Sequence, residues 1–263
     1  MTGLFFELRP GVLEPHGLTA GPHDPNLIAG GAIVGAALSI MERQALVPGR
    51  VGRVTADFLR PAPIETLTIV TRPIRQGRRV SLTEATARSR GYDVAIVSAL
   101  RLATDVSEPV EETARWPIVE DLPDPAALDP IVAWHDGFFG GAIECRTRGG
   151  HQGIGAGWCI ARLCVPIIEG ETPSTIAAAA ALADVAHGVG TPVDQWPPRA
   201  APVNPDLTTS FVRDPQAGWI HLDVAEQWPG DGTGLAKTRL TDRAGLFGVA
   251  LQTQVLTPLG ATS

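Results

Sequence analysis

The stretch Ile28-Ala29-Gly30-Gly31-Ala32-Ile33-Val34-Gly35-Ala36-Ala37-Leu38 contains no charged or hydroxyl side chain. Its residues are small or apolar, and we interpret it as the main part of a helix over residues 28–46. A helix that is apolar on all sides has to be buried on all sides. The other elements are therefore expected to enclose this helix.

Four segments with the character of strands follow the helix. They carry Val, Ile, Thr and Phe in partial alternation, and Gly or Pro residues separate them. A helix followed by several strands lacks the strand–helix alternation of a parallel sheet. We therefore predict a curved antiparallel sheet that wraps around the helix. The expected strands cover residues 51–60, 64–74, 79–89 and 92–103.

The second half of the chain repeats this order. Phe58-Leu59-Arg60 precedes Phe211-Val212-Arg213 by 153 positions, and Gly91 precedes Gly245 by 154 positions. A near-constant offset is what the duplication of one structural unit leaves in a sequence. The second copy is expected to have a helix over 174–188 and strands near 205–213, 218–227, 233–241 and 246–257.

Residues 105–130 separate the two halves. This segment holds eight acidic residues, five prolines and one basic residue, Arg115. Proline at this density argues against a continuous helix or a central strand. We therefore expect a first domain over residues 1–104, a linker over 105–130 and a second domain over 131–263.

Composition narrows the class of protein. The net charge of −7 disfavours a nucleic-acid partner, since such proteins are more often basic. No signal-peptide core is found, and the longest uncharged runs are too short to cross a bilayer. The three cysteines match no zinc spacing and are interpreted as reduced thiols. We expect a cytoplasmic protein without membrane insertion, metal or redox cofactor.

Several short motifs, taken in order and spacing, resemble those of the bacterial acyl-CoA thioesterase II family. The resemblance implies an α+β fold of two tandem hotdog domains, a double hotdog, in which each curved antiparallel sheet wraps around a central helix. It also implies hydrolysis of an acyl-CoA substrate. The motifs are Ala29-Gly30-Gly31, Phe58-Leu59-Arg60-Pro61, Gln76-Gly77-Arg78, Leu182-Ala183-Asp184, Asn204-Pro205-Asp206-Leu207-Thr208, Phe211-Val212-Arg213, Asp242-Arg243-Ala244-Gly245 and Val249-Ala250-Leu251-Gln252.

The resemblance implies catalytic roles for three positions. The family holds and activates the attacking water with an Asp on the second helix, a Thr or Ser on the next strand and a Gln on the last strand. By position these fall on Asp184, Asn204 and Gln252. Asn204 departs from the family pattern, although its amide can still hydrogen-bond a water. Thr208 is the nearest hydroxyl but is out of register, and it is instead a candidate for substrate binding.

Other residues are candidates for substrate binding. Backbone N–H groups at Gly30 and Gly31 could polarise the thioester carbonyl. Arg78, in a hairpin, could bind coenzyme A phosphates. A thiolate leaves readily, so no strong general acid is needed.

The repeat offset also assigns first-half counterparts to two of the catalytic candidates. The counterpart of Asp184 is Gly30 and that of Gln252 is Ser98, so the shared fold does not itself require the polar groups.

Two other functions fit the same fold. Asn204 leaves open a non-catalytic acyl-binding protein. A hotdog hydratase or dehydratase would need a close Asp–His pair, which Asp184 and His187 approach most nearly. A serine hydrolase is disfavoured because no G-x-S-x-G motif is present. Exposed sheet edges favour a homodimer or a higher homo-oligomer.

Overall fold

The computed structural model describes residues 3–45, 49–104, 122–131, 136–148, 156–191 and 200–258. Most of the predicted linker, residues 105–121, lies outside the described residues. The first half contains β1 (Phe6–Arg9), β2 (Val12–Pro15), η1 (Gly17–Thr19), α1 (Gly30–Arg43), β3 (Arg50–Phe58), β4 (Thr68–Gln76), β5 (Val80–Ser89) and β6 (Tyr92–Leu102).

The second half contains the same kinds of element. They are η3 (Pro125–Ala127), β7 (Asp129–Pro130), η4 (Phe138–Ala142), β8 (Ile143–Thr147), β9 (Ala156–Leu163), α2 (Thr175–Ala183), α3 (Ala186–Val189), β10 (Ala200–Val203), β11 (Asp206–Phe211), β12 (Ile220–Gln227), β13 (Thr233–Asp242) and β14 (Gly245–Pro258). The strands predicted in each half and the central helix predicted in the first half are confirmed, with ends that differ by a few residues.

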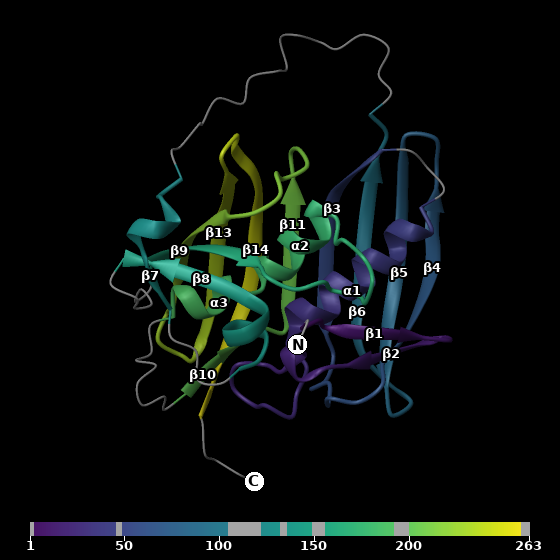
Figure 1. Cartoon of the computed structure of the whole chain (residues 1–263), viewed down its shortest axis with the longest axis horizontal. Coiled ribbons are helices and arrows are strands. Elements are labelled where there is room, and N and C mark those ends of the chain that lie inside the picture. The colour runs from purple at the N-terminus through teal and green to yellow at the C-terminus, as the bar shows by residue number, and fades with distance from the viewer. Residues whose placement is uncertain are drawn as a thin grey trace.

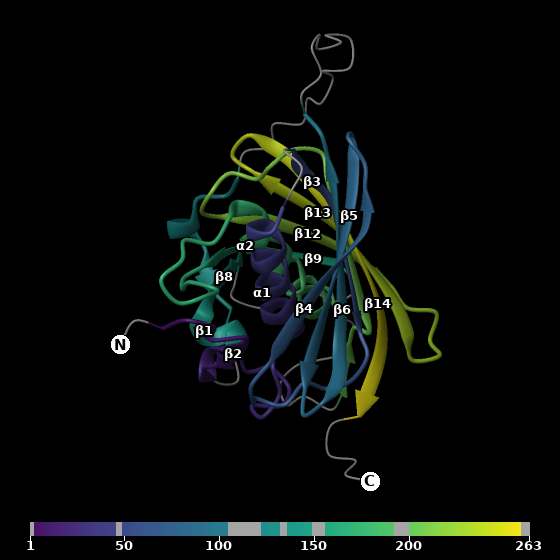
Figure 2. The same ribbon diagram turned by 90° about the vertical axis from the view of Figure 1, so that its right-hand side faces the viewer.

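One large antiparallel sheet joins the two halves (Figure 1). In the described residues its strand order is β4-β5-β6-β3-β11-β14-β13-β12-β9-β8-β7, and β10 pairs with β14. The sheet curves around α1 and α2, which lie together on its concave side (Figure 2). This is the predicted double hotdog, in which both apolar helices are enclosed.

The junction between the halves is symmetric in its register. Thr55 of β3 pairs with Thr208 of β11. Two residues away on either side, Arg53 pairs with Ser210 and Asp57 pairs with Asp206. Residue 53 lies 153 positions before 206, and residue 57 lies 153 positions before 210, so each pair joins the counterparts of the other pair. The two halves are therefore related by an approximate twofold axis beside Thr55 and Thr208.

The register corrects one sequence-based assignment. Thr208 pairs with Leu251, and its counterpart Thr55 pairs with Ser98. Ser98 is therefore the counterpart of Leu251, and the next residue, Ala99, is the counterpart of Gln252. The assignment to Ser98 was wrong because it used an offset one residue too large, which moves a strand residue to the opposite face.

The two central helices run antiparallel and touch through glycine. A Cβ atom added at Gly31 would lie 2.4 Å from the carbonyl oxygen of Ala181, and one at Gly35 would lie 3.2 Å from the Cβ of Ala181. Because these positions lack side chains, the backbones of α1 and α2 approach closely. This contact places the start of α1 beside the end of α2.

The second helix is shorter than predicted. Instead of one helix over 174–188, α2 ends at Ala183 and α3 begins at Ala186. Between them the N–H of Val185 donates to Leu182 three residues back, a tighter turn than the α-helical bond to the fourth residue back. The tightened turn carries Asp184, the first residue after α2.

The helix ends also correct the counterpart of Asp184. Asp184 closes α2, whereas Gly30 opens α1, so the two cannot be equivalent. At the other end of the helix pair the Ser174 hydroxyl, the N-cap of α2, donates to Glu42 near the end of α1 at 2.6 Å.

Several elements were not predicted. Strands β1, β2 and β7 to β10 are short or border glycine- and proline-rich segments, where the alternation is hard to read. The N–H groups of Phe5 and Phe6 donate to Pro166 and Ile167, so the N-terminal segment crosses to the second half. Strand β7, at the end of the predicted linker, pairs with β8. Across the described ranges, each helix is too short or too polar to span a bilayer.

Candidate active site

Asp184 is a buried carboxylate at the junction of the two halves. It is 4% exposed, and its Oδ2 accepts a hydrogen bond of 2.7 Å from the backbone N–H of Gly31, in the first turn of α1. The first N–H groups of a helix have no partner within the helix, and the helix dipole is positive at this end. The start of α1 therefore binds and orients the carboxylate that ends α2.

Two side chains from other elements reach the same carboxylate. The Nδ2 of Asn204, in the turn between β10 and β11, donates to Oδ1 at 2.8 Å. The Nε2 of Gln252, on β14, lies 3.3 Å from the main-chain oxygen of Asp184 and 3.5 Å from Oδ1. The structure thus brings together Asp184, Asn204 and Gln252, the three residues for which the sequence predicted catalytic roles.

Gln252 leaves one polar atom without a protein partner. Its side chain is fully buried, because β14 alternates and Gln252 shares the inner face with Ala250 and Gln254. Within the described residues its Oε1 accepts no hydrogen bond. A buried carbonyl oxygen without a partner is costly, and an ordered water is the usual remedy. Gln252 therefore offers an acceptor for a water beside Asp184.

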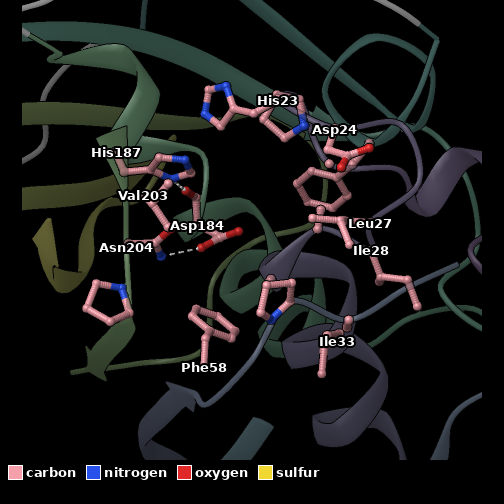
Figure 3. Close-up of a pocket in the computed structure, with 18 of the residues that line it drawn as sticks. His23, Asp24, Leu27, Ile28, Ile33, Phe58, Asp184, His187, Val203 and Asn204 are labelled. Atoms are coloured by element: carbon pink, nitrogen blue, oxygen red, sulfur yellow. Dashed lines mark hydrogen bonds between the residues drawn. The ribbon is translucent and has the colours of Figure 1, made fainter. Parts of the chain in front are cut away.

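A cavity of about 570 Å³ opens beside Asp184 and Asn204 (Figure 3). Its polar end is formed by Asp184, His187 and Asn204 from the second half. Its other walls are largely apolar and come mostly from the first half, including Leu27, Ile28, Ile33, Phe58 and Val94. The cavity therefore joins a hydrogen-bonding end to a wall that suits a hydrocarbon chain.

The predicted substrate-binding residues differ in whether they reach this cavity. Gly30 lines the cavity, and as the first residue of α1 it presents an N–H with no partner in the helix. The N–H of Gly31 is already bound to Asp184. Thr208 lies on β11 and does not line the cavity.

Arg78 lies far along the sheet from this cavity. It is exposed in the turn between β4 and β5, next to the pair formed by Val80 and Leu102. Val94, which lines the cavity, lies at the opposite end of β6.

Two family motifs prove to be packing partners. A Cβ at Gly30 would lie 2.6 Å from the ring of Phe58, so the glycine of the first motif makes room for the aromatic ring of the second. The ring of Phe58 in turn forms part of the cavity wall. Sequence analysis singled out both motifs, but it had no signal for their contact.

A second pair of motifs forms a buried ion pair. The guanidinium of Arg213 donates to both carboxylate oxygens of Asp242, at 2.5 and 2.8 Å. Burial alone would raise the pKa of Asp242. Hydrogen bonds from Arg213 and from the N–H groups of Gln216 and Ala244 outweigh it and lower that pKa. These residues hold the β11 and β13 ends together and do not line the cavity.

His187 is a site residue to which sequence analysis gave no catalytic role. It lies in α3, lines the cavity, and its Nδ1 contacts the main-chain oxygen of Asp184 (Figure 3). Its spacing of three residues from Asp184 was visible in the sequence, but only as a weak hydratase signal. No group of three or more His, Cys, Asp or Glu side chains able to hold a metal occurs in the part of the chain that the structure describes.

The fold and the site define a double hotdog protein with a buried carboxylate between its two central helices. Two family models match the chain: the acyl-CoA thioesterase N-terminal domain over residues 19–102 and the acyl-CoA thioesterase C-terminal domain over residues 111–256. The chain therefore belongs to the acyl-CoA thioesterase family and is a thioester hydrolase. The family suggested by the sequence motifs is confirmed.

Solved structures show the same fold. A hotdog-fold protein from Alicyclobacillus acidocaldarius superimposes with a TM-score of 0.72 at 16% identity, covering 94% of this chain and 92% of its own. An acyl-CoA thioesterase II from Mycobacterium marinum superimposes with a TM-score of 0.62 at 17% identity, covering 98% and 96%. Comparison with curated protein sequences gives no match.

Proposed function

We propose that this protein hydrolyses an acyl-CoA to a free acid and coenzyme A with a water activated by Asp184. The observation that carries the proposal is the coordination of one buried carboxylate. Donors from α1, the β10–β11 turn and β14 fix it in place at the wall of a cavity. Such fixed geometry is what a general base needs.

The reacting water is proposed to lie between Asp184 and the unpartnered Oε1 of Gln252. Asp184 takes one proton from it while the oxygen attacks the thioester carbon. The N–H of Gly30 is placed to stabilise the negative charge that develops on the thioester oxygen. Collapse of this intermediate breaks the carbon–sulfur bond, and no acyl-enzyme forms.

Asn204 takes the place where the family has a hydroxyl residue. Its Nδ2 donates to Asp184 and also lies 3.3 Å from the main-chain oxygen of Asp206. One amide group thus orients the carboxylate and closes the turn before β11. We propose that it replaces the family's Thr or Ser as the group that orients the carboxylate.

The apolar wall supports an acyl chain as the part of the substrate bound there. Leu27, Ile28, Ile33 and Val94 lie on it, away from Asp184 and Asn204. We further propose a cytoplasmic homodimer or higher homo-oligomer, with domains over 1–104 and 131–263 joined by the linker over 105–130.

The test is release of free thiol from a panel of short, long, branched and aromatic acyl-CoAs. Asp184→Asn should lower kcat by at least about tenfold on the best substrate. Asp57→Asn is the matched control, since Asp57 is exposed on β3 and does not line the cavity. Unchanged turnover in folded Asp184→Asn would remove this residue from the mechanism.

The same preparation separates the alternatives left open by the sequence. Hydration of an enoyl-CoA without thiol release would indicate the hydratase. Tight binding of acyl-CoA without turnover by the wild-type protein would indicate the binding protein.

A further inference from the structure

His187 and Glu226 form a second polar arrangement next to Asp184. His187 follows Asp184 by three residues and lines the same cavity. Its Nδ1 contacts the main-chain oxygen of Asp184 (Figure 3). A carbonyl oxygen only accepts hydrogen bonds, so Nδ1 carries the hydrogen. The other nitrogen, Nε2, is therefore the one that gains or loses a proton.

Glu226 approaches α3 from the inner face of β12. A Cβ at Gly190, three residues beyond His187, would lie 2.8 Å from the Cγ of Glu226. The carboxylate accepts hydrogen bonds from Nε1 of Trp228 at 2.8 Å and from Nε2 of Gln254 at 3.1 Å. Burial raises the pKa of Glu226, while these hydrogen bonds and the charge of His187 act in the opposite direction.

The surroundings of the imidazole are mainly acidic on the protein side. Strands β9 and β13 also pack against α3, and their inner faces carry uncharged residues there, with Cys159 as the titratable group. Among the described residues, the charged or titratable groups around His187 are Asp184 on its own segment, Glu226 on β12, and His23, Asp24 and Arg60 at the wall of the cavity.

We propose that His187 is a second catalytic residue, which donates the Nε2 proton to the departing thiolate, and that Glu226, packed against α3, is a positioning residue for it. The inference rests on the proposed function and adds a group to it. A thiol has an ordinary pKa of about 8.5 and a histidine about 6.5. The alkyl thiolate is the more basic of the two, so it can take a proton from a protonated histidine as the carbon–sulfur bond breaks.

The proton balance closes over one turnover. Asp184 gains a proton from the water, and the remaining hydroxyl adds to the acyl carbon. The carbon–sulfur bond breaks with its electron pair on sulfur, and the sulfur takes the proton from His187. Asp184 then returns its proton to His187 through solvent, and both groups are restored. The products are the acid and the free thiol of coenzyme A.

Three thioesters of one acyl group separate this role from others. Acyl-CoA and acyl-pantetheine share an alkyl thiol as leaving group, but only the first has a nucleotide. An acyl nitrothiophenol thioester has a leaving group acidic enough to depart and persist as the anion. The variant is His187→Asn, which keeps an amide donor for the main-chain oxygen of Asp184 but has no acidic proton at the place of Nε2.

The expected result is a loss in kcat of at least about tenfold on acyl-CoA and acyl-pantetheine, with less than about twofold on the aryl thioester. An equal loss on all three substrates would make His187 structural, and a loss on acyl-CoA alone would make it a nucleotide contact. Either outcome overturns the proposal, as does an unchanged kcat on acyl-CoA. Asp184→Asn should lose activity on all three substrates. A failure of the proposed function can therefore be distinguished from a failure of the inference about His187.

Glu226 is tested with the same three thioesters. Glu226→Gln removes the negative charge that packs against α3, and kcat on acyl-CoA and acyl-pantetheine should fall by at least about threefold while kcat on the aryl thioester stays within about twofold. Asp223→Asn, on the outer face of β12, is the control. A loss no larger than that of the control, or an equal loss on the aryl thioester, contradicts the role of Glu226.

Discussion

The backbone N–H of Gly31 and the Oδ2 of Asp184 form a hydrogen bond of 2.7 Å between residues 153 positions apart. One partner opens the helix of the first half, and the other closes the helix of the second half. The same contact therefore packs the two halves together and orients the carboxylate. Damage to the interface between the helices is expected to reduce activity together with stability.

Gly31→Ala tests this coupling. The added methyl group would lie 2.4 Å from the carbonyl oxygen of Ala181 and 2.7 Å from the ring of Phe138, so α1 and α2 have to separate. Overpacking of this kind costs about 1–3 kcal/mol of folding free energy. We expect a lower urea midpoint and a lower kcat in the folded protein.

Gly35→Ala is the matched control, one turn further along α1. Its added methyl group would meet the side chains of Ile167 and Ala181 at 3.0 and 3.2 Å, contacts that small shifts can relieve. It should destabilise less and leave kcat within about twofold. Equal loss of kcat in the two variants would show that the Gly31–Asp184 bond has no special part in activity.

Asn204 allows the family's hydroxyl to be restored. Asn204→Ala removes the 2.8 Å donor to Asp184 and should lower kcat by about tenfold. Asn204→Thr supplies a hydroxyl donor and should retain more activity than the alanine variant. Steady-state thiol release measures both. Equal activity of the alanine variant and the wild type would exclude Asn204 from the site.

Thr238 is predicted to reduce stability in the wild-type protein. It is fully buried on β13, and its hydroxyl has no partner among the residues that the structure describes. Because an unpaired buried hydroxyl costs about 1–3 kcal/mol, Thr238→Val should raise the free energy of unfolding. The control is Thr147→Val, since the Thr147 hydroxyl donates to Trp158 at 2.7 Å. Thr147→Val should lower stability, and a loss in both variants would point to a buried water at Thr238.

Asp242 is predicted to contribute to acid sensitivity. Its pKa is lower in the folded protein, so the folded state holds fewer protons than the unfolded state. The stability it supplies is complete above the ordinary Asp pKa of about 3.9 and is lost as the pH falls through the folded-state value.

Asp242→Asn should remove this dependence. It leaves Arg213 without its charged partner, at a cost on the order of 3 kcal/mol at pH 7. The difference from the wild type should shrink as the pH falls below 4, as measured by urea unfolding at several pH values. A constant difference across this range would contradict the ion pair.

Most of the fold was predictable because both halves of the chain carry the same order of helix and strands. The buried character of residues 28–38 and the repeated strands fix the helix and sheet of each half. What could not be predicted depends on pairing between distant segments. Ser98 and Ala99 are neighbours on β6 and point to opposite faces of the sheet. Which of them corresponds to Gln252 is set by the register with β3. The break of the second helix at Asp184 follows from its contact with α1, which leaves no local signal.

The site was predictable to a similar degree. Asp184, Asn204 and Gln252 came from motif positions, and the fold brings Asn204 and Gln252 within hydrogen-bonding distance of Asp184. Arg78 was a reasonable phosphate ligand from composition alone, but the hairpin carries it to the far end of the strands. The pairing of His187 with Glu226 joins residues 39 positions apart on different elements, so spacing could not indicate it.

The contact between Glu42 and Ser174 shows what joining two units into one chain allows. In an assembly of two identical subunits, any substitution appears at both ends of the helix pair. One end therefore cannot become a reaction centre while the other becomes a purely structural contact. Here Ala99 is the counterpart of Gln252, and at the far end of the helix pair from Asp184 the Glu42 carboxylate is bound to a hydroxyl. Each polypeptide should therefore turn over a single thioester at a time, with calorimetric titration of a substrate analogue giving one equivalent per chain.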